Sequence, residues 1–105
     1  MKYKIAGTAC LLLAAGAVAA AGNPADGRTK SETCLGCHGV PSYNNVYPTY
    51  HVPRLPGQHA DYIVAALKEY RDGKRKHPTM NAQASTLSDQ DMADIGAFWE
   101  AQGKE

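Results

Sequence analysis

The chain has little excess charge and few cysteines, and each shortage excludes a class of protein. Lysine and arginine together number 11, against 10 aspartates and glutamates, which gives a formal net charge of +1 over 105 residues. Domains that bind nucleic acid carry a marked excess of basic residues, so this balance argues against such a partner. The three cysteines include no second close pair to complete a four-ligand zinc site. Strand patterns are also missing, which predicts an all-α fold.

The first 21 residues have the pattern of a cleavable secretory signal peptide. Residues 1–4 carry two lysines, and residues 5–18 form an uncharged run rich in alanine and leucine. Small residues then offer cleavage sites after Ala19 or Ala21. A retained membrane anchor is the alternative, but the run is near the lower edge of the roughly 17–25 residues that span a bilayer. We therefore expect residues 1–21 to be removed on export to the periplasm.

Removal of this segment changes the length, the charge balance and the cysteine count of the chain. Residues 22–105 form one domain of 84 residues, and the loss of Lys2 and Lys4 leaves nine basic residues against ten acidic ones. Cys10 leaves with the same segment, so two cysteines remain. A domain this short buries only a marginal core and commonly needs a staple or a cofactor.

The two remaining cysteines belong to the most informative motif of the chain, Cys34-Leu35-Gly36-Cys37-His38. This C-x-x-C-H pattern is typical of a covalently attached c-type haem. Thiols three positions apart can each add to one vinyl group of the same porphyrin, and the histidine that follows is carried under the ring. A thioredoxin-like redox pair is the alternative for a bare C-x-x-C, but it requires flanking strands that this sequence lacks. The motif predicts Cys34 and Cys37 as thioether sites and His38 as an iron ligand.

Apolar periodicity predicts three main helices in the exported domain. They cover residues 24–34, 58–72 and 88–103, and the second has the clearest apolar stripe. The segments between them, residues 39–57 and 74–87, are predicted to be loops.

Local signals mark the ends of these helices. Asn23 is a possible N-cap for the first helix, although Gly27 weakens that helix. Gly73 follows the second helix as a C-terminal stop. Ser88 and Asp91 form a capping-box pattern at the start of the third.

An iron held by His38 has a sixth position to fill, and its occupant decides the function. The candidates are Met80, Met92, His51, His59 and His77. Met80 is preferred because it follows Pro78-Thr79 in a predicted loop, from which a thioether can reach the opposite face of the haem. Met92 lies on a helix face, where core packing is the simpler role. His77 is the main alternative, since a slip of three residues would exchange it for Met80.

The order of these motifs resembles class I cytochrome c. The segments Leu55-Pro56-Gly57-Gln58, Pro78-Thr79-Met80 and Leu87-Ser88-Asp89 are most similar to small bacterial cytochromes related to c553 and to the halves of dihaem cytochrome c4. The resemblance covers nearly all of residues 22–105. It implies a fold of three main helices around one covalent haem c, with His38 as proximal and Met80 as distal ligand.

The same resemblance implies further contacts around the haem. The carbonyl of Pro53 would accept a hydrogen bond from His38 and so fix its tautomer. The N- and C-terminal helices would cross near Gly96, with Ile95, Phe98 and Trp99 packed around the crossing.

Ligation on both faces implies electron transfer rather than catalysis. Substrate cannot reach such an iron, so outer-sphere Fe(III)/Fe(II) exchange through an exposed haem edge is the expected chemistry. We expect a monomeric electron shuttle, not an enzyme, that meets periplasmic or membrane-bound redox proteins briefly. The alternatives are a haem protein with a labile sixth site for peroxide or gas, and a fixed electron-entry subunit of one redox complex.

Two surface features leave alternatives open. The tyrosine-rich segment 41–51 is either a loop that covers one haem edge, with tyrosines reaching the propionates, or a docking surface. A basic group runs into the Met80 loop and is either a solvated face or a surface that steers an acidic partner. Its members are Lys68, Arg71, Lys74, Arg75 and Lys76.

Overall fold

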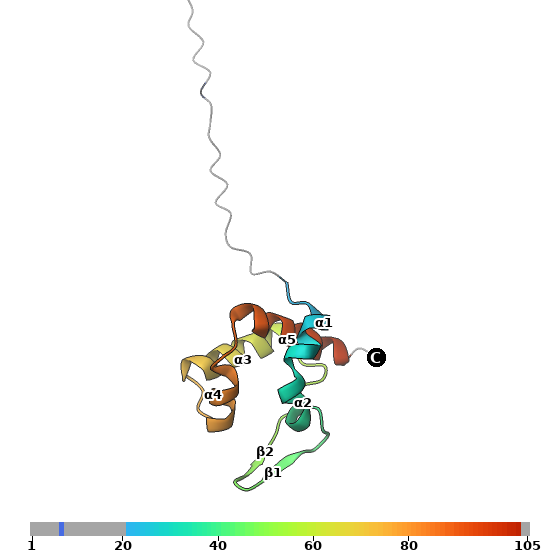
Figure 1. The fold of residues 1–105 in the computed structure, drawn as a ribbon, viewed down its shortest axis with the longest axis vertical. Coiled ribbons are helices and arrows are strands. Elements are labelled where there is room, and N and C mark those ends of the chain that lie inside the picture. The colour runs from blue at the N-terminus through green and yellow to red at the C-terminus, as the bar shows by residue number, and fades with distance from the viewer. Residues whose placement is uncertain (1–6, 8–20, 104–105) are drawn as a thin grey trace, which may run out of the picture.

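The computed structural model describes Gly7 and residues 21–103, and within these residues it is mostly helical (Figure 1). The elements are α1 (Pro24–Lys30), α2 (Glu32–His38), β1 (Asn44–Val46), β2 (Thr49–His51), α3 (Ala60–Asp72), α4 (Pro78–Ala84) and α5 (Asp89–Gln102). The all-α prediction is confirmed apart from one small hairpin. Most of the expected signal peptide lies outside the described residues. Among the described helices, none has the length and apolar character needed to cross a membrane.

The first predicted helix is divided in two. Asn23 caps α1 as expected, because its side-chain oxygen accepts the amides of Ala25 at 2.9 Å and Asp26 at 3.2 Å. The chain then leaves α-helical geometry at Ser31, which has φ −91° and ψ 3°. A second helix, α2, starts directly afterwards and continues to His38. The prediction of one helix over residues 24–34 is therefore wrong at its C-terminal end, and the break gives the haem motif a helix of its own.

Helix α1 packs across α5 near Gly96, as the resemblance implied, but the glycine that permits the close approach is Gly27, which lies against Asp94 and Phe98. A Cβ atom on Gly27 would fall on the backbone carbonyl oxygen of Asp94, so only glycine allows the two helices this close. Gly96 serves another contact, because a Cβ there would lie 2.9 Å from the carbonyl oxygen of Ala60 in α3. The glycine that weakens α1 as an isolated helix is thus the residue that permits its packing.

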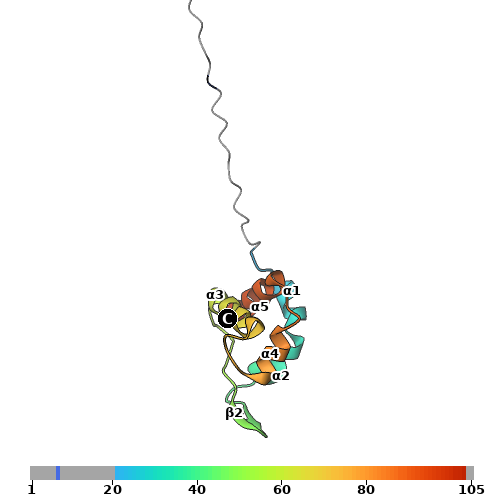
Figure 2. The same cartoon turned by 90° about the vertical axis from the view of Figure 1, so that its left-hand side faces the viewer.

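The core lies where α3 and α5 meet, and the two views in Figures 1 and 2 show these helices side by side. Met92, Ile95, Phe98 and Trp99 of α5 are buried there, together with Ile63 and Leu67 of α3. The expected core role of Met92 is confirmed, since the residue is fully buried.

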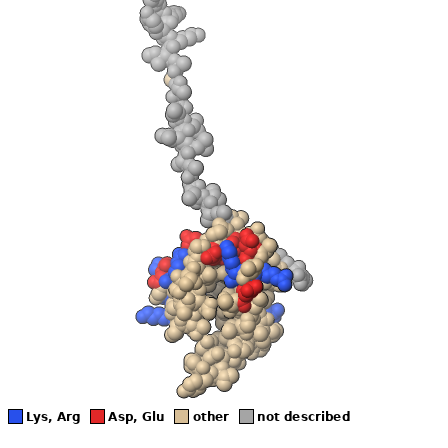
Figure 3. All heavy atoms as spheres, viewed as in Figure 1, with Lys and Arg blue, Asp and Glu red and all other residues tan. Residues whose placement is uncertain are grey.

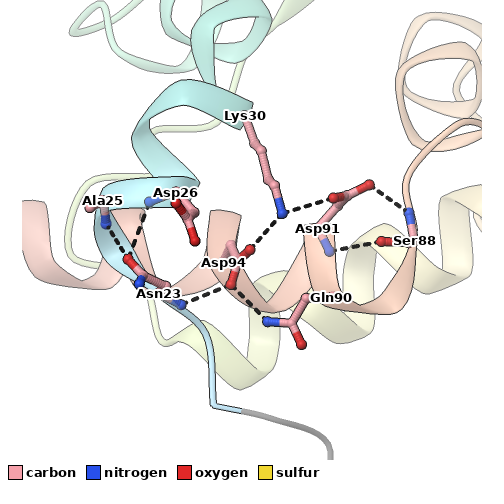
Figure 4. Close-up of polar contacts among 8 residues, drawn as sticks. All are labelled: Asn23, Ala25, Asp26, Lys30, Ser88, Gln90, Asp91 and Asp94. Carbon is pink, nitrogen blue, oxygen red and sulfur yellow. Dashed lines mark hydrogen bonds and ion pairs between the residues drawn. The ribbon is translucent and has the colours of Figure 1, made fainter.

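A polar network fastens the start of the domain to α5 (Figure 4). Asp94 is only 2% exposed, and its carboxylate accepts hydrogen bonds from the amide of Asn23 at 2.8 Å, Lys30 Nζ at 2.6 Å and Gln90 Nε2 at 2.8 Å. The backbone bond to Asn23 and the ammonium of Lys30 lower the pKa of Asp94 to about 2. Lys30 also pairs with Asp91 at 2.9 Å, and the two carboxylates raise its pKa. This network fixes α1, and with it the direction in which α2 leaves.

The predicted helix ends at Gly73 and Ser88 are confirmed. Gly73 ends α3 in the left-handed conformation, with φ 78°. The Ser88 hydroxyl accepts the Asp91 amide at 3.0 Å, while the Asp91 carboxylate accepts the Ser88 amide at 2.9 Å. Both orphan amide groups at the start of α5 are therefore paired.

Both predicted loops contain regular structure. Strands β1 and β2 form an antiparallel hairpin inside the expected 39–57 loop, with Asn44 opposite His51. Two side chains brace its turn: Asn45 Nδ2 donates to the Pro48 carbonyl at 2.6 Å, and Thr49 Oγ1 donates to the Val46 carbonyl at 2.8 Å. The hairpin projects from the helical body (Figure 2). The expected 74–87 loop contains α4, which begins immediately before Met80.

Candidate haem site

Helix α2 brings three residues of the C-x-x-C-H motif to one cleft of about 340 Å³, a volume typical of sites for organic ligands. Cys34, Cys37 and His38 all line it. Cys34 is half-buried and Cys37 exposed, and both thiols are free. Burial raises the pKa of the Cys34 thiol. Two free thiols one helical turn apart beside a buried imidazole suit a covalent tetrapyrrole.

The His38 ring is held by the backbone. Its Nδ1 lies 2.7 Å from the carbonyl oxygen of Pro53. A carbonyl oxygen can only accept, so Nδ1 carries the proton, and the lone pair of the ring is then on Nε2. His38 itself is buried, with 8% exposure. This contact was implied by the family resemblance, and it leaves Nε2 free to bind a metal.

Met80 lines the same cleft from another element. It stands in the first turn of α4 rather than in the predicted loop, and it packs against the core as a half-buried residue. Figure 1 shows α2 and α4 on different sides of the molecule below α3 and α5. The cleft is therefore lined by an imidazole and a thioether from separate helices.

The other sixth-position candidates differ in how they are placed. His77 lines the cleft, but its Nδ1 accepts the Met80 amide at 3.4 Å, and its ring packs edge-on against Tyr50 with centroids 4.7 Å apart. His51 also lines the cleft and lies 3.1 Å from Asn44 across the hairpin. His59 is exposed and lies outside the cleft, at the N-cap position of α3, where its side chain makes no capping hydrogen bond.

The tyrosine-rich segment divides into two parts with different surroundings. Tyr50 and His51 line the cleft, and the Tyr50 hydroxyl lies 3.4 Å from Thr79 Oγ1 beside Met80. Val46 and Tyr47, at the hairpin tip, are instead 83% and 94% exposed. The base of the hairpin is thus a wall of the cleft, while its tip is presented to solvent.

Charged side chains are concentrated on the helical body, and the lower part of the molecule in Figure 3 shows almost none. The stretch from Gly39 to Pro53 contains no lysine, arginine, aspartate or glutamate. Two members of the basic group are paired within the molecule, Arg71 with Asp89 at 2.8 Å and Arg75 with Glu69 at 3.2 Å. Pairing of these arginines leaves the exposed lysines as the main source of positive field there.

Sequence reasoning missed Asn81, which follows Met80 and bonds to three backbone groups around the start of α4. Its Oδ1 accepts the His77 amide, and its Nδ2 donates to the carbonyls of Tyr70 and Arg75. No spacing rule joins an asparagine to carbonyls six and eleven positions earlier, so no sequence signal could have found this residue.

Comparison with known proteins agrees with this geometry. Residues 24–100 match the cytochrome c family. The chain is 42% identical to cytochrome c-554(548) of Halomonas halodenitrificans over 85 residues, which is 78% of this chain and 99% of that protein. It is 37% identical to cytochrome c4 of Pseudomonas aeruginosa over 83 residues, covering 79% of this chain and 40% of the relative.

A third relative is named for its role as an electron acceptor. The thiosulfate dehydrogenase electron acceptor of Stutzerimonas stutzeri is 34% identical over 108 residues, which cover 94% of this chain and 47% of that protein. The chain therefore spans nearly the full length of one relative and less than half of the other two.

The match over most of the helical domain, the relatives above 30% identity and the single C-x-x-C-H motif lead to one conclusion. The chain belongs to the cytochrome c family, as a class I electron-transfer cytochrome with one covalently bound haem c.

Proposed function

We propose that the chain is a periplasmic electron shuttle in which His38 and Met80 hold the two axial positions of the haem iron. The observation that carries this proposal is that both side chains line one cleft from different helices, α2 and α4. Cys34 and Cys37 line the same cleft and would anchor the haem through thioether bonds.

The chain's own residues prepare these ligands for one-electron exchange. The Pro53 carbonyl holds the His38 ring in the tautomer that directs Nε2 into the cleft. The Met80 thioether favours Fe(II) more than a second imidazole would, so a relatively high reduction potential is expected. Haem supplies the Fe(III)/Fe(II) couple when it is bound.

His77 is the alternative sixth ligand, and one contact disfavours it. Its Nδ1 is engaged with the Met80 amide at the start of α4, so ligation through that nitrogen would cost the helix its N-cap. Met80 has no such competing role. We therefore retain Met80 as the sixth ligand.

Partners of the proposed shuttle are periplasmic or membrane-bound redox proteins, met through a small and short-lived interface. One relative is named as an electron acceptor of thiosulfate dehydrogenase. By analogy, enzymes that oxidise small inorganic sulfur compounds are a reasonable class of donor for this chain. Export rests on the signal-peptide pattern of residues 1–21. Mass spectrometry of the periplasmic protein should give an N-terminus at Ala20 or Gly22; a retained leader would contradict export.

Absorption spectra of the holoprotein test the ligand set. We expect the oxidised wild type to show a far-red sulfur-to-iron band, and the reduced wild type not to bind carbon monoxide. Met80→Ala should abolish the band and admit carbon monoxide, while Met92→Leu, a change of the buried core methionine, should alter neither.

Two outcomes would contradict the ligand set. A wild type that lacks the band and binds carbon monoxide readily would indicate a labile sixth site, as in a peroxide- or gas-binding protein. Absence of both the band and carbon monoxide binding would indicate a second histidine, and His77→Ala should then open the site.

A further inference from the structure

The side chain of Asn81 joins the segment that carries Met80 to α3 by hydrogen bonds, in addition to the core packing of Ala84 and Met80. Asn81 is half-buried and makes three hydrogen bonds to backbone groups. Its Oδ1 accepts the amide of His77 at 3.0 Å, and its Nδ2 donates to the carbonyls of Tyr70 at 2.8 Å and Arg75 at 2.9 Å. The amide group of one residue therefore joins the end of α3, the connection after it and the start of α4.

These bonds add to the capping at the end of α3 and at the start of α4. Tyr70 lies in the last turn of α3, and its carbonyl accepts the Gly73 amide at 3.3 Å as well as Asn81 Nδ2. His77 is the N-cap of α4, and its ring accepts a hydrogen bond from the Met80 amide. The backbone amide of His77 in turn donates to Asn81 Oδ1. The two residues therefore cap the start of α4 reciprocally, as in a capping box, but with histidine at the N-cap and the returning acceptor on Asn81, one position later than the usual N3.

The place where Asn81 joins α3 to α4, here called the α3–α4 junction, lies beside the cleft. Tyr70 and Arg75 line the cleft together with Met80, so Asn81 connects two of its walls. Helix α4 has only seven residues and could not hold a fixed position by its own hydrogen bonds. The placement of Met80 therefore depends on what ties the first turn of α4 to its neighbours.

We propose that Asn81 is a positioning residue that holds the first turn of α4 against the end of α3 and thereby fixes the Met80 sulfur in the cleft. The proposal rests on the proposed function in one respect, namely that Met80 is the sixth ligand. Asn81 does not line the cleft, so it acts only through Met80.

Amide hydrogen exchange of the holoprotein tests the mechanical part directly. In Asn81→Ala, the backbone amide of Met80 should exchange at least tenfold faster, which corresponds to about 1.4 kcal/mol of local opening free energy. Asn81→Asp should be no better, because it keeps the acceptor but sets a carboxylate against two carbonyl oxygens. The matched control is Ser85→Ala, which removes the bond from Ser85 Oγ to the Ala82 carbonyl at the other end of α4. Unchanged exchange of the Met80 amide in Asn81→Ala would overturn the proposal.

A second readout links the junction to the ligand. Imidazole added to the oxidised holoprotein should displace the sixth ligand at an at least tenfold lower concentration in Asn81→Ala than in wild type or Ser85→Ala. Gly27→Ala is a second control, since it should lower global stability without touching α4. Imidazole affinity that follows global stability in all variants, or that does not change in Asn81→Ala, would refute a positioning role. A wrong ligand assignment would be detected separately, because Met80→Ala would then keep the far-red band of the wild type.

Discussion

Replacement of Asp94 by asparagine should lower the stability of the holoprotein by a pH-dependent amount. Asp94 is buried, with 2% exposure, and its pKa falls from 3.8 to about 2, first because of the Asn23 amide and then because of Lys30. One pKa unit is worth about 1.4 kcal/mol, so the charged carboxylate contributes about 2 kcal/mol to folding at neutral pH. The folded-state pKa is below the unfolded one, so this contribution is complete above about pH 4 and is lost as the pH falls towards 2.

Guanidinium unfolding followed by far-ultraviolet circular dichroism measures this effect. We expect Asp94→Asn to lose about 2 kcal/mol of unfolding free energy at pH 7 but only about 1 kcal/mol at pH 3, where linkage leaves roughly half of the contribution. Asp26→Asn is the matched control, because it removes the same charge from an exposed position of α1 and should change stability by about 0.5 kcal/mol or less.

Two results would refute this reasoning. An equal loss at pH 7 and pH 3 would show that Asp94 acts through its number of hydrogen-bond acceptors and not through its charge. A loss no larger than that of Asp26→Asn would show that the network in Figure 4 contributes nothing net, as many ion pairs do.

Three further predictions concern packing, capping and charge. Gly27→Ala should lower the unfolding free energy by about 2 kcal/mol or more, because the added methyl group meets the Asp94 carbonyl. Calorimetry of the holoprotein measures this loss, and a smaller value would show that α1 and α5 can move apart. Ser88→Ala should cost about 1 kcal/mol in the same assay, and no cost would mean that water replaces the capping box. Lys74→Glu should slow oxidation of the reduced holoprotein by hexacyanoferrate at low salt and speed oxidation by a cationic cobalt complex. Both effects should vanish at high salt, and identical changes with the two reagents would exclude an electrostatic origin.

Features that depend on near neighbours in the chain were predictable. The Asn23 cap, the Gly73 stop and the capping box of Ser88 and Asp91 each involve groups within three residues or one backbone conformation. The haem motif belongs to the same class, since five consecutive residues define it. Local chemistry is sufficient for such features, so tertiary packing did not change them.

Features that depend on tertiary packing were not predictable. The hairpin has strands of only three residues each, too short for an alternating pattern to stand out. Helix α4 begins with a histidine N-cap, which is outside the usual set of capping residues. The role of Gly27 could not be read from α1 alone either, because glycine lowers helix propensity whether or not another helix crosses it.

The structure separates the framework of the domain from the segment that carries Met80, the proposed distal ligand. Asp94 joins the start of the domain and α1 to α5 through Asn23 and Lys30, whereas Asn81 joins α3 to α4 through a different set of partners. His38 depends on the first network, because α2 leaves directly from α1. Met80 depends on the second, because α4 is too short to hold itself. The two sides of the cleft can therefore loosen independently, which would let substitutions at the α3–α4 junction alter the sixth ligand while the His38 side and the core stay intact.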